Sequence, residues 1–418
     1  MRASVGGSRA AVIGGGIGGL AAAIGLQRTG WDVTVYEASP RIRGSGGGIG
    51  ITPNGLQALA ALGLADAVLA VSVHQTEGGV RRPDGRWVAR SDLGFIEQRF
   101  GYGLLALPRF RLVELMAGAL TKPPVLGTRV TDLHPGSAHD PARIFGPAAE
   151  PDFDLVVVAD GVRSAMRQLL YPSFDRYRHA GCCSWRFVGR ADGDEAPAAE
   201  TWGRGIRVSL LPVAADIVHC SVMASCRRDE YQAADHPSLL SEWLADWHRP
   251  LPRLVSNLRD QPLFFDDIFE LEEPLPSLRV GRAVLLGDAA YPMTPNVGAA
   301  NLALEDAVTL SSEAQPVSDW PTLKRRVDAY SSARLGRRRV LATLSNRMGR
   351  YALPRGRTAT TFRNLSTALG GHLPTGTTAR ALDRVFRWSP HEPMSVARTS
   401  TRAGTPQRPS DHTPGAKP

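Results

Sequence analysis

A glycine-rich segment near the N-terminus has the composition and spacing of a phosphate-binding turn. Gly14, Gly16 and Gly19 satisfy the pattern G-x-G-x-x-G, and Ile17 is the first residue expected in the helix that follows. In such a turn the first glycine permits a tight bend and the second lets a pyrophosphate approach the backbone. The third allows the helix to pack closely on the strand. The free amides at the helix start then face the phosphate oxygens.

An acidic residue follows at a suitable distance. Glu37 ends the next apolar segment, eighteen residues after Gly19, close to the usual spacing of about 20. Its carboxylate can accept hydrogen bonds from ribose hydroxyls and would repel a 2′-phosphate. The glycine motif and this acid together predict FAD or NAD, and not NADP, at this site.

The elements that position these residues are predicted from local pattern. Residues 10–13 form a short apolar strand, residues 17–29 a helix that ends before Gly30, and residues 33–36 a second strand. A glycine commonly follows the last residue of a helix. The segment therefore predicts a βαβ unit.

Two distant segments predict further strands of the same sheet. Residues 153–159 and 282–286 are almost entirely apolar, as expected of parallel strands with both faces covered. Asp160 and Gly161 follow the first run, and Asp288 follows the second. Polar groups at the carboxyl ends of parallel strands face the crevice where such sheets bind ligands.

The remaining segments have different compositions. Residues 180–270 alternate between apolar and polar side chains, which predicts an antiparallel sheet inserted into the parallel one. Residues 321–350 predict a long basic helix, and residues 321–358 hold eleven basic side chains and one acidic. The last twenty or so residues are rich in Pro, Thr, Ser and Arg, which predicts disorder.

These observations predict an α/β protein with a Rossmann-like dinucleotide-binding domain on a parallel sheet, an inserted antiparallel sheet, and a C-terminal helix. The expected divisions are 1–175 (first part of the dinucleotide-binding domain), 176–275 (antiparallel-sheet domain), 276–320 (second part of the dinucleotide-binding domain), 321–396 (helical region) and 397–418 (disordered tail).

Three motifs in order give the chain a resemblance to the group A flavoprotein monooxygenases, the aromatic hydroxylases typified by para-hydroxybenzoate hydroxylase. They are the N-terminal glycine motif, the segment from Asp160 to Arg167, and Gly287-Asp288. The resemblance runs from about residue 10 to residue 350. It implies tightly held, noncovalent FAD, transient binding of NAD(P)H, and transfer of oxygen from a C4a-hydroperoxyflavin to an aromatic or heteroaromatic ring. It implies no metal and no catalytic nucleophile.

The resemblance also implies a set of cofactor-binding residues. Asp288 would bind the ribityl chain, and Arg109 would lie near the FAD. The full expected set is Gly14, Gly16, Ile17, Gly19, Glu37, Gly48, Arg109, Val130, Asp160, Gly161, Asp288 and Gly298.

One loop departs from the family pattern Pro-x-x-Gly-Gln-Gly-x-Asn. Residues 295–301 read Pro-Asn-Val-Gly-Ala-Ala-Asn, one residue shorter and without the second glycine. Either the loop closes differently or flavin binding is weakened. Two alternatives to the hydroxylase therefore stay open: a flavin-dependent dehydrogenase or reductase that inserts no oxygen, and a flavin-deficient relative without catalysis.

Substrate-pocket candidates come from the alternating region and the segment after Asp288. The residues around Arg207 are similar to FAD-dependent urate hydroxylases, whose matching arginine sits in the substrate pocket, but a surface-facing arginine would give the same alternation. His219 falls where that subgroup has tyrosine. It is either an acid–base group or a merely packed histidine. Tyr291 and Pro292 complete the candidates.

Composition excludes several classes. No apolar run reaches the roughly 20 residues that cross a bilayer, and no reading motif for nucleic acid accompanies the basic segment. The four cysteines form neither CxxC pairs nor zinc-type spacings, which favours free thiols in a reducing cytoplasm. The expected partners are a small aromatic molecule and O2.

Overall fold

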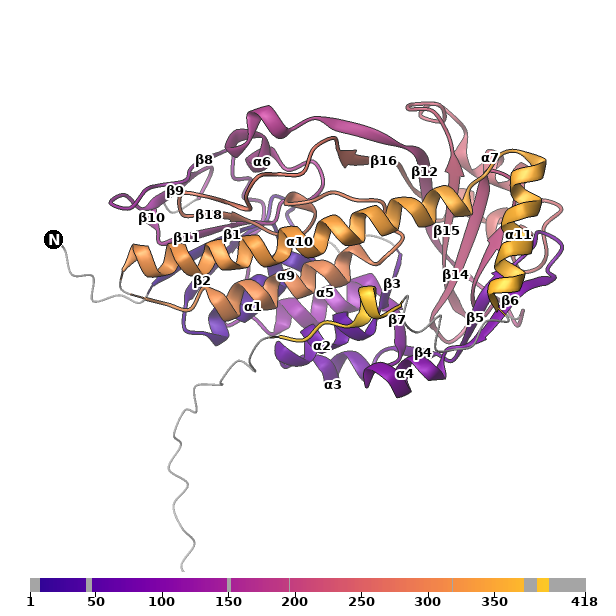
Figure 1. Ribbon diagram of the computed structural model, residues 1–418, viewed down its shortest axis with the longest axis horizontal. Coiled ribbons are helices and arrows are strands. Elements are labelled where there is room, and N and C mark those ends of the chain that lie inside the picture. The colour runs from indigo at the N-terminus through magenta and orange to yellow at the C-terminus, as the bar shows by residue number, and fades with distance from the viewer. Residues whose placement is uncertain are drawn as a thin grey trace, which may run out of the picture.

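The computed structural model describes residues 8–42, 47–148, 152–194, 196–317, 319–371 and 382–390. The expected tail, 397–418, lies outside these residues. Two large sheets occupy opposite ends of an elongated molecule, and the 33-residue helix α10 (Trp320–Ala352) runs along both (Figure 1). This helix confirms the predicted basic helix and extends it by one residue at the start and two at the end.

The first sheet has the strand order β17-β18-β11-β1-β2. Its four strands from β18 to β2 are parallel, and β17 pairs antiparallel at one edge. The predicted βαβ unit and both distant strands are thus confirmed as neighbours. The bounds are β1 (Arg9–Ile13), β2 (Asp32–Tyr36), β11 (Leu155–Val158), β17 (Arg279–Val280) and β18 (Ala283–Leu285).

The strand predicted over residues 153–159 is divided. Phe153 belongs to β10 (Asp152–Phe153), which pairs with another sheet, whereas β11 starts at Leu155. Between them the amide of Asp154 donates to Arg9 O and its side chain accepts from Arg9 N. Continuous hydrophobicity did not reveal this change of partner.

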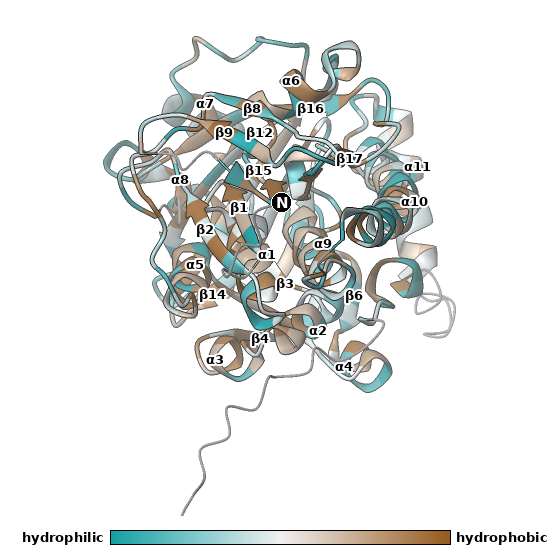
Figure 2. Ribbon diagram, turned by 90° about the vertical axis from the view of Figure 1, so that its left-hand side faces the viewer, coloured by the Kyte–Doolittle hydropathy of each residue, from teal (hydrophilic) through white to brown (hydrophobic). Residues whose placement is uncertain are grey.

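Helices enclose the parallel sheet. Figure 2 shows the apolar strands β1 and β2 inside a layer of helices whose outer faces are more hydrophilic. Helix α1 (Ile17–Arg28) packs against α9 (Ala299–Glu313), and Gly30 follows α1 with φ +102°. The other helices are α2 (Pro53–Ala61), α3 (Ala65–Leu69), α4 (Gly94–Phe100), α5 (Arg109–Gly118), α6 (Ala165–Leu170), α7 (His236–Leu244), α8 (Leu251–Ser256) and α11 (Arg357–Gly371).

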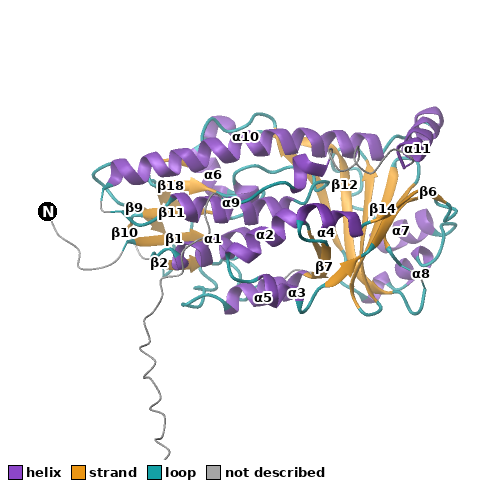
Figure 3. Ribbon diagram, turned by 60° about the horizontal axis from the view of Figure 1, so that its bottom comes forward, coloured by secondary structure: helices purple, strands orange, loops and turns teal. Residues whose placement is uncertain are grey.

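The second sheet has the order β16-β12-β15-β14-β13-β5-β6. Figure 3 shows its strands β12, β14 and β6 at the opposite end of the molecule from β1, β2, β11 and β18. Its bounds are β5 (Glu77–Arg81), β6 (Trp87–Asp92), β12 (Tyr177–Arg190), β13 (Ala198–Trp202), β14 (Ile206–Ala214), β15 (Ile217–Ser225) and β16 (Phe264–Leu271). Two smaller sheets have the orders β3-β7-β4 and β10-β9-β8, with β3 (Gly48–Ile51), β4 (Val73–Gln75), β7 (Leu104–Pro108), β8 (Asp132–His134) and β9 (Ala142–Phe145).

The second sheet corrects the predicted antiparallel insertion in one respect. Strands β5 and β6 come from the segment before residue 176, and β5 pairs parallel with β13. The sheet is therefore mixed and is built from two separate parts of the chain. The alternation within residues 180–270 could not reveal that the edge of β13 is covered by a strand from residues 77–81.

Among the described residues, no helix combines the length and hydrophobicity that crossing a bilayer requires.

Candidate active site

The glycine motif forms the turn that its spacing predicts. Gly14 has φ +110°, and a Cβ there would lie 2.4 Å from the carbonyl oxygen of Ala159. A Cβ at Gly19 would lie 2.0 Å from the carbonyl oxygen of Gly14. Gly16 precedes α1, whose first residue is Ile17, and a Cβ on Gly16 would meet no atom within 4 Å. Two glycines thus allow close packing, and the third faces open space at a helix N-terminus.

Glu37 is held beside this turn by two backbone amides. Its Oε2 accepts from Gly15 N at 2.7 Å, and its Oε1 accepts from Ser39 N at 2.7 Å. Each carboxylate oxygen keeps a second lone pair for a ribose hydroxyl. Glu37 N donates to Val125 O at 3.0 Å, and the buried Val130 follows five residues later along that segment.

Arg167 joins the second and third motifs. It is fully buried at the C-terminal side of the Asp160 segment, and it donates to the backbone oxygens of Ala289 at 2.7 Å and Val162 at 3.0 Å. Its guanidinium also pairs with Asp175 at 3.2 Å. Two segments more than 120 residues apart are therefore fixed to each other by one side chain.

Several polar groups beside these motifs lack a protein partner. Asp160 Oδ1 and Arg109 Nε are buried without a hydrogen bond, and burial raises the pKa of Asp160 and lowers that of Arg109. Asp288 has exposed surface, yet burial raises its carboxyl pKa, so the side chain lies in a recess of the protein. Gly161, with φ +90°, likewise has open space where a Cβ would be.

The open space at Gly16, the unpartnered atoms Asp160 Oδ1 and Arg109 Nε, and the recessed Asp288 fit an extended dinucleotide. Buried polar groups in folded proteins nearly always have a hydrogen-bond partner. Unpaired buried atoms on two separate segments therefore indicate a ligand. The pKa of Arg109 is affected by both Asp288 and Arg186, which places charges from the two halves of the molecule near one another.

An ion cluster beneath the third motif was not predicted. Asp306 Oδ2 accepts from Gly287 N at 3.0 Å and from Arg338 Nε at 3.0 Å, and Asp306 also pairs with Arg334 at 2.6 Å. Arg334 also donates to Glu305 at 2.8 Å. The turn that carries Asp288 is thus anchored to α10. The spacing of the arginines on α10, opposite two adjacent acids on α9, is the signal that could have indicated this cluster.

The shortened loop closes without a strained alanine. Gly298 has φ +78° and precedes α9, which starts at Ala299, so the two alanines adopt helical backbone angles. The Asn301 side chain donates to Gly50 O at 3.0 Å and accepts from Thr52 N at 3.3 Å. The shorter loop therefore closes with glycine at its one left-handed position.

The face of the second sheet that includes Arg207 carries polar side chains in two rows. Directly paired residues share a face, and the rows are Ser184–Met223–Arg207–Trp202 and Arg186–Ser221–Ser209–Glu200. Arg207 is 7 % exposed, which excludes the surface-facing alternative. Its guanidinium contacts Asn296 of the shortened loop and Glu200 at 3.4 Å. Glu200 and Asn296 were not among the predicted residues.

His219 lies on the same face, paired with Val188 and Leu211. Burial lowers its pKa to about 4, and a hydrogen bond to the backbone of Phe187 opposes that shift. Nδ1 is buried and has no hydrogen-bond partner in the protein. The low pKa makes the ring neutral near pH 7, and Nδ1 is available for a hydrogen bond with a ligand.

Gly48 and Tyr291 border this region. A Cβ on Gly48 would lie 2.6 Å from His219 Cβ, so glycine lets β3 approach the second sheet. Tyr291 is half-buried and Pro292 is buried directly after the Asp288 turn. Burial raises the pKa of the Tyr291 hydroxyl.

The sequence of this chain is similar to those of known FAD-dependent proteins. Residues 9–149 match the model of the FAD dependent oxidoreductase family. The chain is 32 % identical to the aurachin C monooxygenase/isomerase of Stigmatella aurantiaca, over 81 % of this chain and 88 % of that protein. It is 32 % identical to the FAD-dependent urate hydroxylase of Klebsiella pneumoniae, over 78 % of this chain and 86 % of that one.

A solved structure is similar across almost the whole chain. Klebsiella pneumoniae HpxO, complexed with FAD and uric acid, aligns with a TM-score of 0.80 and 26 % identity, over 92 % of this chain and 97 % of HpxO. Fold and site together define an FAD-dependent oxidoreductase. More particularly, the chain belongs to the FAD-dependent monooxygenases that hydroxylate aromatic and heteroaromatic rings.

Proposed function

We propose that this protein is a cytoplasmic hydroxylase that uses NAD(P)H and O2 to oxidise a heteroaromatic small molecule with a polar ring edge. The proposal depends above all on the polar rows of the second sheet, which meet the loop after Asp288 through the contact of Arg207 with Asn296. The similarity to a urate hydroxylase supports a nitrogen heterocycle as the substrate class. The four buried, free cysteines support a reducing compartment.

FAD would be held by all three motifs. The open N-terminus of α1 at Gly16 would bind the pyrophosphate, and Glu37 would accept from the adenosine ribose. Asp288 would bind the ribityl chain, with Arg109 beside it. The chemistry that FAD supplies when bound is acceptance of hydride from NAD(P)H and activation of O2.

The substrate would be oriented by donors and acceptors on the sheet face. Arg207 can donate to a ring carbonyl or oxyanion, and the neutral His219 can accept an N–H or O–H at Nδ1. Ser221 stands next to Ser209 across the strands and near both groups. Such a pattern fits a ring in which an N–H neighbours a carbonyl, as in an oxopurine.

We also propose that the two halves divide these tasks. Residues 1–175 and 276–320 would supply the FAD-binding half, and residues 176–275 the substrate half, to which β5 and β6 also contribute. Residues 321–396 would connect them through α10.

A substrate panel tests the proposed function. Purified holoenzyme is incubated with oxopurines, quinolones, phenols and simple benzoates, and both NAD(P)H consumption and product mass are measured. We expect stimulated NAD(P)H oxidation and a gain of one oxygen atom with a heterocycle that contains an N–H beside a carbonyl. Reduction of substrate without oxygen gain would instead support the dehydrogenase. Turnover of phenols alone would contradict the proposed ring class.

A further inference from the structure

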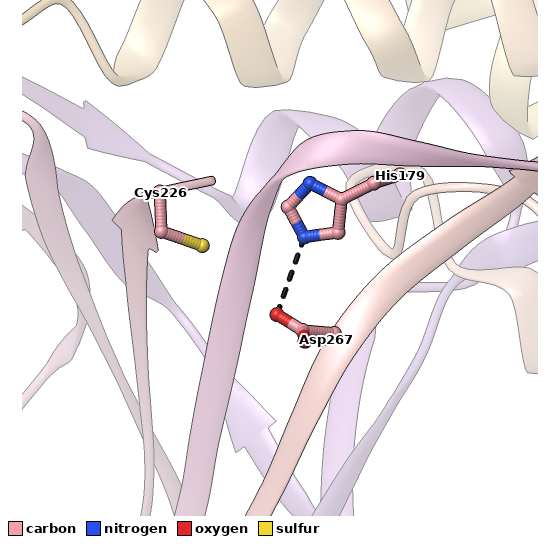
Figure 4. A group of neighbouring side chains, drawn as sticks. All are labelled: His179, Cys226 and Asp267. Carbon is pink, nitrogen blue, oxygen red and sulfur yellow. Dashed lines mark hydrogen bonds and ion pairs between the residues drawn. The ribbon is translucent and has the colours of Figure 1, made fainter. Parts of the chain in front are cut away.

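Three side chains with metal-binding atoms converge on the second sheet, away from the flavin half. His179 lies in β12, Cys226 directly after β15, and Asp267 in β16, and their ligand atoms all lie within 4.8 Å of one another (Figure 4). All three are largely buried: the side chains of His179 and Asp267 are 11 % and 6 % exposed, and Cys226 is 5 % exposed.

Sheet register explains why residues from three separated segments meet. Cys183 on β12 pairs directly with Asp267, and a β-bulge between His179 and Cys183 shifts the preceding part of β12. Cys226 N donates to Gly181 O at 3.0 Å, which ties the end of β15 to this bulge. Successive ligands are at least 41 positions apart in the sequence, a spacing that resembles no zinc motif, and only the folded sheet reveals the group.

We propose that His179, Cys226 and Asp267 bind one Zn²⁺ ion. Thiolate, imidazole and carboxylate are the ligands that zinc uses in proteins, and three protein ligands with a fourth position open are an established arrangement. One thiolate and one carboxylate neutralise the two charges of the ion, so the complex is uncharged in a buried place.

Zinc binding requires a defined movement of protons. Without metal, Gly181 N donates to His179 Nδ1 at 3.2 Å, and Nε2 faces Asp267 Oδ1 at 3.2 Å, so Nε2 carries the ring proton. On binding, the zinc–Nε2 bond forms as this proton shifts to Nδ1, and the Cys226 thiol releases one proton to solvent as the zinc–sulfur bond forms. Net proton release is therefore one per zinc.

The bulge can accommodate this shift. A protonated Nδ1 needs an acceptor where Gly181 N now points. Gly181 has φ +78°, and a Cβ there would meet nothing within 4 Å, so the peptide between residues 180 and 181 has space to turn. That turn presents the carbonyl of Ala180 to Nδ1–H, the type of outer partner that metal-bound histidines usually have. Asp267 Oδ2 is already held by Asp229 N at 3.1 Å.

The consequence of the site is a cross-link between β12, β15 and β16. The opposite faces of β12 and β15 carry Arg186, Ser221 and His219, so zinc would stabilise the strands beneath the polar rows. The inference does not depend on the proposed substrate, because metal binding and hydroxylation are measured separately.

Zinc titration of the flavin-loaded enzyme tests the proposal. The holoenzyme is treated with a chelator, dialysed, and titrated with ZnCl2 under a thiol-free reductant. We expect one zinc per chain and a raised melting temperature, since a ligand of the folded state stabilises it. Cys226→Ala should weaken binding at least about 100-fold, beyond the 10–100-fold loss typical of an outer partner. Cys220→Ala is the matched control, because Cys220 is equally buried and lies outside the group.

A second readout covers a variant that fails to fold. Cobalt added in place of zinc should give ligand-field absorption at the red end of the visible spectrum, where oxidised flavin does not absorb, and Asp267→Asn should diminish it. The proposal is overturned if the wild-type holoenzyme binds no zinc at micromolar concentration. It is also overturned if Cys226→Ala and Cys220→Ala bind zinc equally, since the group would then be only a hydrogen-bonded contact between β12 and β16.

Discussion

The two proposed halves of the molecule would bind their ligands through different kinds of groups. In the flavin half the decisive features are backbone features: a turn at Gly14, an open helix end at Gly16, and the ends of parallel strands. In the substrate half the backbone forms a regularly paired sheet. The groups that could contact a substrate are side chains that project from this sheet, such as Arg207 and His219. The first kind of site depends on glycine positions. The second depends on which face each residue of a strand occupies.

The largest effect is expected where glycine permits contact between backbone segments. Gly19→Ala would place a Cβ 2.0 Å from Gly14 O and should abolish both flavin retention and stable folding. Gly16→Ala meets no protein atom and has φ −77°, which alanine adopts readily. This variant should fold with normal circular dichroism but lose flavin, as measured by absorbance after gel filtration. A Gly16→Ala variant that keeps as much flavin as the wild type would contradict the assignment of Gly16 to the pyrophosphate.

The next effect concerns the ion cluster that anchors the flavin half to α10. Arg338→Met removes a fully buried partner of Asp306 and should lower the free energy of unfolding by about 3–5 kcal/mol. The adjacent residue Arg339 is exposed and provides the control. Arg339→Met should change the free energy of unfolding by less than about 0.5 kcal/mol. Urea denaturation of both variants measures the difference. Similar midpoints for the two would show that the cluster contributes little to stability.

The substrate half should contribute a pH dependence through His219. Its pKa is about 4 in the folded protein against 6.5 in the unfolded chain. Between these values the unfolded chain binds the proton and the folded protein does not, so the free energy of unfolding falls as pH drops from 6.5 to 4. The share of one such group is at most about 3 kcal/mol. Urea denaturation at pH 7 and pH 4.5 gives the free energy of unfolding at each pH. The difference between the two values should be smaller in His219→Gln than in the wild type by this amount. An equal difference in both proteins would contradict the prediction.

The smallest effect separates substrate binding from flavin binding. Arg207→Met should lower kcat/KM by about tenfold, in line with the loss of one charged hydrogen bond, while flavin content stays unchanged. Arg204→Met, three residues earlier and exposed, should leave both unchanged. Steady-state kinetics with the substrate identified in the panel measures this. Loss of flavin from Arg207→Met would remove the distinction between the two halves.

The difference between the halves also explains what could be predicted from the sequence. The parallel strands and the turn were predictable because continuous hydrophobicity and glycine spacing are local properties, and β1, β2, β11 and β18 lie where these placed them. The interruption at Asp154 and the pairing of β5 with β13 were not, because they depend on a partner strand far along the chain.

The same limit applied to side chains. Arg207 was identified as a candidate, but alternation could not decide between its buried and exposed orientations. Glu200, Asn296 and Arg338 were missed because their significance arises from contacts with residues that only the packed sheet and helices bring close. The partners lie seven, 89 and 32 positions away in the sequence, respectively. The unpartnered Nδ1 of His219 depends on how the folded chain buries the ring and has no local signature.

The strand order of the parallel sheet constrains how the chain is made. Strand β18 (Ala283–Leu285) pairs with β11 from a position nearly 130 residues further along, after every strand of the second sheet has been translated. Long-range parallel pairing is slow because it closes large loops. A nascent chain on the ribosome thus completes its substrate sheet while the nucleotide half still lacks β18 and Asp288. A flavin site that needs all three motifs would therefore be complete only after residue 288 has been translated.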